Sequence, residues 1–323
     1  MKPLIKYRGG KTREIPHIRW YVPRFSGRYV EPFFGGGALF FHLEPRQAIV
    51  GDINAKLMGF YQGVRDDYPR LRHELDEVEA LYAANRRDFE QLKREHPDER
   101  VEDKNEALYY RLRAMYNGTQ PKAFSDALLY YFINKTAYSG MIRFNARGEF
   151  NVPYGRYHNV NTSSVTAAHS RLLRRAELYT GDYSRIFDLC QADDFVFLDP
   201  PYDCTFSDYG NAEYRDGFSE DDHRRLAQDF ANLPCKALMV IGRTPLTEAL
   251  YRGYIRDEYE KHYAVNIRNR FKSEARHIIV ANYVTTCDRN VEAGNYTFDE
   301  TGQPEIAQMM LFEGEQEKVY GTD

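Results

Sequence analysis

Short apolar segments alternate with helical patterns along this chain, and the alternation restricts the fold more than any other feature. Several of these segments end in glycine, aspartate or proline, which is typical of buried strands that run into turns. An amphipathic helix is predicted from Ser219, its N-cap, to about Leu233. Strands separated by helices favour a mostly parallel α/β sheet, covered on both faces, with ligands at the carboxyl ends of the strands. The predicted strands lie within residues 28–33, 47–54, 193–202, 235–242 and 276–284.

A long helical stretch interrupts this alternation. From Ala55 to about Arg113 the pattern is helical and charged, and no strand is predicted within it. A further helix and short β-prone pieces follow, with a hairpin turn at Arg147-Gly148. After Thr285 the chain becomes polar and reads as a loose tail. We therefore expect a discontinuous α/β domain (1–54 and 165–285), an insert (55–164) and a flexible C-terminal tail (286–323).

Composition restricts the class of protein. The 323 residues carry a formal net charge of -4, whereas proteins that bind DNA usually present a basic surface. Acidic residues are concentrated in 74–106 and the tail, while arginines cluster at 143–156, 171–175 and 268–276. The net charge therefore neither supports nor excludes nucleic-acid binding, which depends on these local patches. No apolar run approaches the roughly 20 residues that span a bilayer, and no secretory signal pattern is present. The four cysteines form no CxxC pair, which argues against structural zinc and favours a reducing, cytoplasmic location.

Glycines follow the first predicted strand. Gly35 and Gly37 would let the backbone approach a bound ligand closely, because glycine has no Cβ. Asp52 ends the next strand, where its carboxylate can accept hydrogen bonds from both ribose hydroxyls of a nucleoside. A dinucleotide fingerprint would need glycine in place of Phe40, so a nucleoside without phosphates is favoured. Taken alone, the glycines are also compatible with an ordinary tight turn. A second glycine-rich segment, around Lys11, lacks the earlier glycine and the preceding strand of a P-loop.

The most informative motif is Asp199-Pro200-Pro201-Tyr202, at the end of a buried strand. An exocyclic aromatic amine is a poor nucleophile, and two hydrogen-bond acceptors on its hydrogens stabilise the positive charge that develops during methyl transfer. The Asp199 carboxylate and the Pro200 carbonyl can be these acceptors, because consecutive prolines fix φ and place no N–H beside that carbonyl. Tyr202 offers a face on which an extruded base can stack. The alternative is a plain strand-ending turn.

Three segments follow one another along the chain: Lys6-Tyr7-Arg8-Gly9-Gly10-Lys11, Glu31-Pro32-Phe33-Phe34-Gly35-Gly36-Gly37 and Asp199-Pro200-Pro201-Tyr202. In this order they resemble the signature motifs of the Dam-type (D12 class) DNA adenine methyltransferases, and residues 134–157 resemble the DNA-reading hairpin of that family. The resemblance covers roughly residues 4–284. It implies a Rossmann-like, S-adenosylmethionine-dependent methyltransferase domain with an inserted helical plus β-hairpin DNA-recognition domain. It also implies direct transfer of a methyl group to N6 of a flipped adenine in duplex DNA, with no metal and no covalent enzyme intermediate.

The resemblance assigns residues to the cofactor and to catalysis. Tyr7 and Lys11 would contact the cofactor from the N-terminal segment, and Asp182 would contact its adenine. The implied catalytic residues are Asp199, Pro200 and Tyr202. The implied cofactor-binding residues are Tyr7, Lys11, Gly35, Gly37, Asp52, Asp182 and Asp199.

The resemblance also assigns DNA contacts. Tyr138 occupies the position of an aromatic residue that wedges into the duplex beside the flipped base. Arg143 and Arg156 match contacts to base edges or phosphates, and arginine pairs most often with guanine. Pro153 matches an apolar contact to a thymine methyl. Ser139 stands where members that recognise GATC often carry asparagine, and its side chain is shorter. The resemblance therefore implies a GATC-like target but does not fix GATC as the sequence.

The C-terminal tail contains Gln308-Met309-Met310-Leu311-Phe312, which resembles the peptide that bacterial proteins use to dock onto the replicative sliding clamp. In that interpretation Gln308 hydrogen-bonds at the rim of a cleft, and Leu311 and Phe312 enter it. Packing of the same apolar residues against the α/β domain is the alternative.

Two other functions stay open at this point. The chain could methylate cytosine N4, RNA or a protein amide, although aspartate at position 199 favours adenine and the hairpin favours duplex DNA. It could also be a catalytically silent DNA-binding or clamp-associated factor, against which the intact motifs argue. The recognition sequence, and the existence of a partner nuclease in a restriction-modification system, stay open as well.

Overall fold

The computed structural model describes residues 1–7, 9–202, 218–261 and 275–285. The clamp-binding prediction for Gln308, Leu311 and Phe312, and the predicted tail, lie outside these residues.

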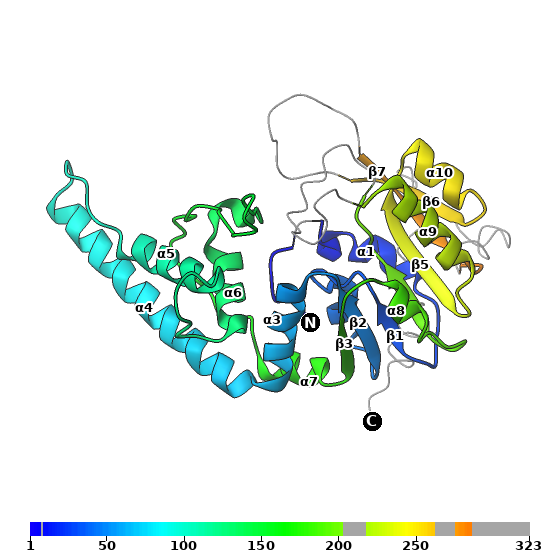
Figure 1. Ribbon diagram of the computed structural model, residues 1–323, viewed down its shortest axis with the longest axis horizontal. Coiled ribbons are helices and arrows are strands. Elements are labelled where there is room, and N and C mark those ends of the chain that lie inside the picture. The colour runs from blue at the N-terminus through cyan, green and yellow to red at the C-terminus, as the bar shows by residue number, and fades with distance from the viewer. Residues whose placement is uncertain (8, 203–217, 262–274, 286–323) are drawn as a thin grey trace, which may run out of the picture.

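Seven strands of the described chain form one sheet in the order β3-β2-β1-β4-β5-β7-β6 (Figure 1). The first five strands in this order pair in parallel, whereas β7 is antiparallel to both β5 and β6. The predicted α/β fold with a mostly parallel sheet is therefore confirmed. The strands are β1 (Tyr29–Glu31), β2 (Ala48–Asp52), β3 (Ala176–Thr180), β4 (Phe195–Leu198), β5 (Lys236–Gly242), β6 (Ile255–Lys261) and β7 (Ala275–Ala281).

Alternate residues of the strands point to two separate cores, one on each face of the sheet. Tyr29 and Val50 belong to the first core, whereas their neighbours Val30 and Ile49 belong to the second. The first core is covered by α1 (Ile15–Ile18), α2 (Ala38–Leu43), α3 (Ala55–Asp66) and α7 (Ala167–Leu173). The second is covered by α8 (Ser184–Phe187), α9 (Glu220–Ala231) and α10 (Pro245–Tyr251). Helix α9 begins as predicted, with the Ser219 side chain accepting a hydrogen bond from the Asp222 N–H at 3.2 Å.

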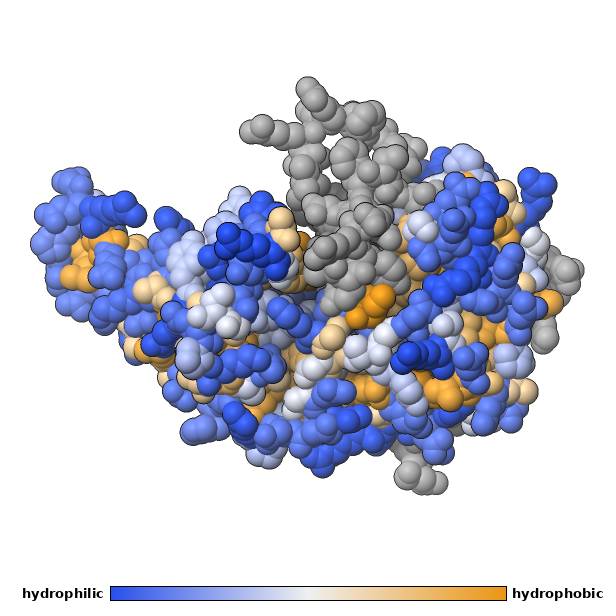
Figure 2. Space-filling view, viewed as in Figure 1, coloured by the Kyte–Doolittle hydropathy of each residue, from blue (hydrophilic) through white to orange (hydrophobic). Residues whose placement is uncertain are grey.

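Helices α4 (Tyr68–Glu95), α5 (Lys104–Tyr116) and α6 (Asp126–Thr136) extend to one side of the sheet (Figure 1). The face shown in Figure 2 is mostly hydrophilic along α4 and α5, as expected for helices that cover only a narrow apolar core. No described helix combines the length and the apolar character needed to cross a membrane.

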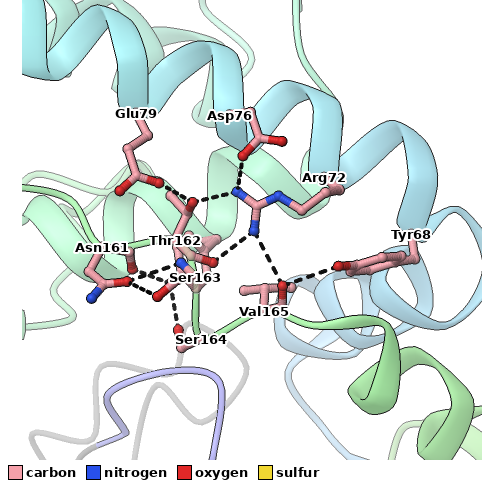
Figure 3. A network of polar contacts seen from close by, with 10 residues as sticks. Tyr68, Arg72, Asp76, Glu79, Asn161, Thr162, Ser163, Ser164 and Val165 are labelled. Carbon is pink, nitrogen blue, oxygen red and sulfur yellow. Dashed lines mark hydrogen bonds and ion pairs between the residues drawn. The ribbon is translucent and has the colours of Figure 1, made fainter.

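A polar network holds the chain where it returns from these helices toward the sheet (Figure 3). The Arg72 guanidinium on α4 donates to the carbonyl oxygens of Thr162 at 2.9 Å and of Val165 at 3.2 Å. The Thr162 hydroxyl in turn donates to the Glu79 carboxylate, and Tyr68 donates to the Val165 carbonyl at 3.4 Å. Because charged groups satisfy main-chain carbonyls here, residues 161–165 are fixed on α4 although they form no helix or strand.

We predict opposite effects for two alanine substitutions in α3. A Cβ added at Gly63 would lie 2.5 Å from the Ala127 Cβ on α6, whereas a Cβ at Gly59 meets nothing within 4 Å. Gly63→Ala should therefore destabilise the protein by about 1–3 kcal/mol through overpacking. Gly59→Ala should stabilise it by about 0.5–1 kcal/mol, because alanine favours a helix over glycine. Urea unfolding of both variants checks this, and equal shifts in the same direction would contradict the close packing of α3 on α6.

Candidate active site

The sheet order creates a switch point between β1 and β4, because the chain continues to β2 on one side and to β5 on the other. Loops that leave neighbouring strands at such a point diverge and open a crevice at the carboxyl ends. The turn after β1 and the Asp199–Tyr202 segment after β4 leave from this point. Together with the N-terminal segment they line an open cavity.

The glycine turn is held by a carboxylate from the next strand. Asp52, 7% exposed, accepts hydrogen bonds from the N–H of Gly35 and of Asn54, both at 2.9 Å. Gly35 and Gly37 have φ values of 46° and 62°, which glycine adopts without strain. Asp52 also lines the cavity. The structure thus places it where the sequence predicted, and adds a structural task in shaping the turn.

The N-terminal segment forms another wall of the cavity. A Cβ at Gly35 would lie 2.7 Å from the Tyr7 ring, and a Cβ at Gly36 would lie 3.1 Å from the Tyr7 Cβ, so these segments are in close contact. Lys11 begins the short 3-10 helix η1 (Lys11–Arg13), and its side chain is almost wholly buried. Its ammonium group lies 2.5 Å from Asp199 Oδ1 and 3.1 Å from the Gly9 carbonyl.

Tyr202 is supported by residues that the sequence did not single out. Its ring lies 5.0 Å from the Lys11 ammonium and 5.0 Å from the His277 ring on β7, which it meets edge-on. His277 Nδ1 lies 2.8 Å from a Glu14 carboxylate oxygen, and the Tyr259 hydroxyl donates to the same oxygen at 2.5 Å. His277 and Glu14 are buried. They were missed because 263 residues separate this pair in the chain.

Glu31 is a further cavity residue to which the sequence analysis gave no role. It ends β1, is 2% exposed, and accepts a hydrogen bond from the Tyr29 hydroxyl at 2.9 Å. Burial raises the pKa of the Glu31 carboxyl well above its ordinary value, and the charge of Asp199 adds to this, although the Tyr29 hydrogen bond opposes it. An acidic residue at the end of a buried strand, four positions before the first glycine of the turn, was the available signal.

Asp182 lies at the edge of this arrangement. Its neighbours Gly181 and Tyr183 line the cavity, but its own carboxylate pairs with Arg225 on α9 at 2.9 Å and accepts from the Ser184 N–H at 3.0 Å. Its contact to a cofactor stays a prediction.

The proposed DNA-reading residues lie on the segment after α6. The predicted turn is present, with the Gly148 N–H donating to the Asn145 carbonyl at 2.9 Å. The arms meet through two isolated bridges, Ala137 to Tyr154 and Phe144 to Phe150, and do not form a regular two-stranded ladder.

The structure brings three of the five predicted DNA contacts together. The Tyr138 N–H donates to the Pro153 carbonyl at 2.9 Å, and Ser139 follows Tyr138 in a left-handed conformation with φ of 54°. Tyr138 is 56% exposed. Arg143 donates to Asn151 across the turn at 2.8 Å, and Arg156 extends toward Glu106 on α5, 3.7 Å away.

A mostly parallel sheet with a cavity at its switch point is typical of Rossmann-like α/β proteins. Residues 7–269 match the model of the D12 class N6 adenine-specific DNA methyltransferases. The chain therefore belongs to that family, and it is an adenine-specific DNA methyltransferase.

Named relatives agree with this assignment. A type II methyltransferase of Paramecium bursaria Chlorella virus NC1A is 33% identical over 88% of this chain and 100% of its own length. A type II methyltransferase of Methanocaldococcus jannaschii is 33% identical over 72% of this chain and 80% of its own. The retron Ec67 DNA adenine methylase of Escherichia coli is 29% identical over 79% of this chain and 82% of its own.

We predict that Glu31→Gln alters the pH dependence of stability. Because burial raises the pKa of Glu31 in the folded chain, the folded state keeps a proton that the unfolded chain loses above a pH of about 4.3. Wild-type stability should therefore fall as pH rises from that value toward the folded pKa. Glutamine is neutral and can still accept from Tyr29, so the variant should lose this dependence and gain stability relative to wild type toward neutral pH. Urea unfolding without cofactor at several pH values tests this, and parallel profiles would refute it.

Proposed function

We propose that this protein transfers the methyl group of S-adenosylmethionine to N6 of an adenine flipped out of a specific, GATC-like duplex DNA sequence. One observation carries the proposal. In a chain of the D12 class, Asp199, Pro200 and Tyr202 line the same switch-point cavity as the glycine turn and Lys11.

The residues of the cavity fit this cofactor. Glu31, Asp52, Asp199 and Lys11 line the cavity. Burial favours the protonated form of Glu31, and Lys11 pairs with Asp199, so the charge left over is the negative charge of Asp52. A net negative cavity suits a ligand whose sulfonium, α-ammonium and carboxylate groups sum to one positive charge. Aromatic side chains beside them offer surfaces for an adenine ring. S-adenosylmethionine supplies, when bound, an electrophilic methyl group. The residues proposed to hold it are Tyr7, Lys11, Gly35, Gly37, Asp52, Asp182 and Asp199.

Asp199 and Pro200 would prepare the amino group of the target base. The Lys11 ammonium group fixes Asp199 Oδ1, and so orients the carboxylate at the end of β4. One hydrogen of the amino group would bond to this carboxylate and the other to the Pro200 carbonyl. Both oxygens then stabilise the positive charge that grows on the nitrogen as the new N–C bond forms and the bond between the methyl group and sulfur breaks, which leaves a neutral thioether. The nitrogen would lose its extra proton along the hydrogen bond to the Asp199 carboxylate. Tyr202, held against His277, would stack on the base.

We assign recognition of the duplex to the insert, residues 55–164. Tyr138 is more exposed than Tyr110, the other exposed tyrosine in the described part of this insert, and the hydrogen bond to Pro153 fixes its backbone. An exposed, anchored ring suits a wedge that fills the space left by a flipped base. Arg143, Arg156, Pro153 and Ser139 would contact the bases or the phosphates around it.

The role of Asp199 is tested with Asp199→Asn. The substitution keeps the shape of the side chain but removes the charge that faces the target amino group, so methyl transfer should fall by about 10²- to 10³-fold or more. DNA affinity should change little, because the proposed DNA contacts lie on the insert. Mass spectrometry of nucleosides from methylated DNA measures the first quantity, and fluorescence anisotropy measures the second.

Asp66→Asn is the matched control for this variant, because Asp66 is exposed on α3 and pairs only with its neighbour Arg65 among the described residues. It should methylate at the wild-type rate. Loss of DNA affinity as large as the loss of rate in Asp199→Asn would contradict the separation of the two sites.

Base flipping is tested with Tyr138→Ala. Sequencing of methylated adenines in DNA from cells that express the protein first defines the target sequence. A duplex with 2-aminopurine in place of the target adenine should then brighten on binding to the wild type, because the base leaves the stack. Tyr138→Ala should lose most of this signal. Tyr110→Ala removes another exposed tyrosine, on α5, and should keep it. An unchanged signal in Tyr138→Ala would exclude the wedge.

A further inference from the structure

A reciprocal pair of hydrogen bonds joins the N-terminal segment to helix α6. The Lys6 N–H donates to Asn134 Oδ1 at 2.9 Å, and Asn134 Nδ2 donates to the Lys6 carbonyl at 2.7 Å. The Asn134 side chain thus pairs with both main-chain groups of one residue, as a neighbouring strand would. Asn134 is 7% exposed, so water competes little with these bonds.

Lys6 and Asn134 each lie a few residues before residues of the two proposed binding sites. Lys6 precedes Tyr7, whose ring packs on the glycine turn, and lies five residues before Lys11, which holds Asp199. Asn134 lies in the last turn of α6, four residues before Tyr138. The contact therefore spans the short distance between the wall of the cofactor cavity and the root of the DNA-reading segment.

The charged side chains around this contact do not supply the attraction. Burial lowers the pKa of Lys135 to about 8, and the charge of Lys6 contributes to this shift, so two ammonium groups lie near one another. Like charges oppose the approach of the two segments. The Lys6 ammonium lies 4.6 Å from the Tyr157 ring, a weaker contact than the paired hydrogen bonds. The two segments share an apolar core through Leu4, Ile5 and Ile133, and the Asn134 amide is the directional contact that sets their register.

We propose that Asn134 is a positioning residue through which cofactor binding and DNA binding strengthen one another. This inference rests on the proposed function, which places the cofactor at Tyr7 and Lys11 and the duplex at Tyr138. A duplex that fixes the end of α6 would also fix Lys6, and with it the cavity wall. A cofactor that fixes the wall would favour the DNA-bound arrangement by the same factor, since such coupling is reciprocal.

The test is the coupling ratio, which is the Kd for S-adenosylhomocysteine without target duplex divided by the Kd with it. This product analogue binds without reaction, so the measurement does not depend on activity. The full-length wild type should show a ratio of about 5 or more. Asn134→Leu has a similar volume but neither hydrogen bond, and its ratio should fall toward 1. Asn134→Asp keeps the hydrogen-bond acceptor but loses the donor, and it should lower the ratio as well. This variant replaces Asn134→Leu in the test if the leucine variant does not fold.

Asn105→Leu is the matched control. Asn105 is also a buried asparagine whose Nδ2 donates to a main-chain carbonyl, that of Tyr82 at 2.9 Å, and whose Oδ1 accepts, from Asn85 at 3.0 Å. Among the described residues these two side-chain bonds join α5 to α4, so the variant should lose thermal stability yet keep the wild-type ratio.

The outcomes separate the two proposals. A wild-type ratio in a folded Asn134→Leu variant, or an equal fall in Asn105→Leu, would overturn the positioning role. A wild-type ratio of 1 would overturn it too. Failure of the wild type to bind either S-adenosylhomocysteine or the duplex would overturn the proposed function itself, and the coupling with it.

Discussion

The ion pair between Lys11 and Asp199 is the contact on which the cavity depends. The Lys11 side chain is 2% exposed, and its ammonium lies 2.5 Å from Asp199 Oδ1. An ammonium group is costly to bury without a counter-charge, and Asp199, whose side chain is 22% exposed, supplies that charge. Folding must therefore bring the N-terminal segment against the loop after β4. The closed wall near Tyr7 and the position of the Tyr202 ring beside the ammonium follow from this one requirement.

Parallel register supplies the rest of the cavity. Glu31 at the end of β1 lies beside Val50 of β2, so the turn that follows β1 passes the last residue of β2, Asp52. The Asp52 carboxylate can then accept the Gly35 N–H, which a residue one position away could not do with its side chain on the other face. A carboxylate that stabilises the turn and also lines the cavity explains why the two motifs occur together in the sequence.

The sequence predicted the parts of this arrangement that local pattern determines. Apolar runs revealed β1, β2, β4, β5 and β7, and the Ser219 cap revealed the start of α9. Strands β3 and β6 were missed because they lie at the two edges of the sheet. An edge strand such as β6, with the sequence IRDEYEK, is held by its hydrogen-bonded neighbour and has no apolar run. Glu14 and His277 were missed for a related reason, since only the closed fold brings them behind Tyr202.

The net charge of -4 argues at first against a DNA-binding protein. The charge that a bound duplex would meet, however, depends on where the charged residues lie. Residues 286–323 contain nine acidic and two basic residues, a net charge of -7, so residues 1–285 carry +3. Within this part, many acidic groups of α4 are neutralised by arginines one turn away, as in the pairs Arg72 with Asp76 and Arg86 with Glu90. Between residues 137 and 157 there are three arginines and one glutamate. Because salt screens charges beyond about 8 Å at physiological ionic strength, a phosphate near this segment responds to its local positive charge and not to the sum over the chain.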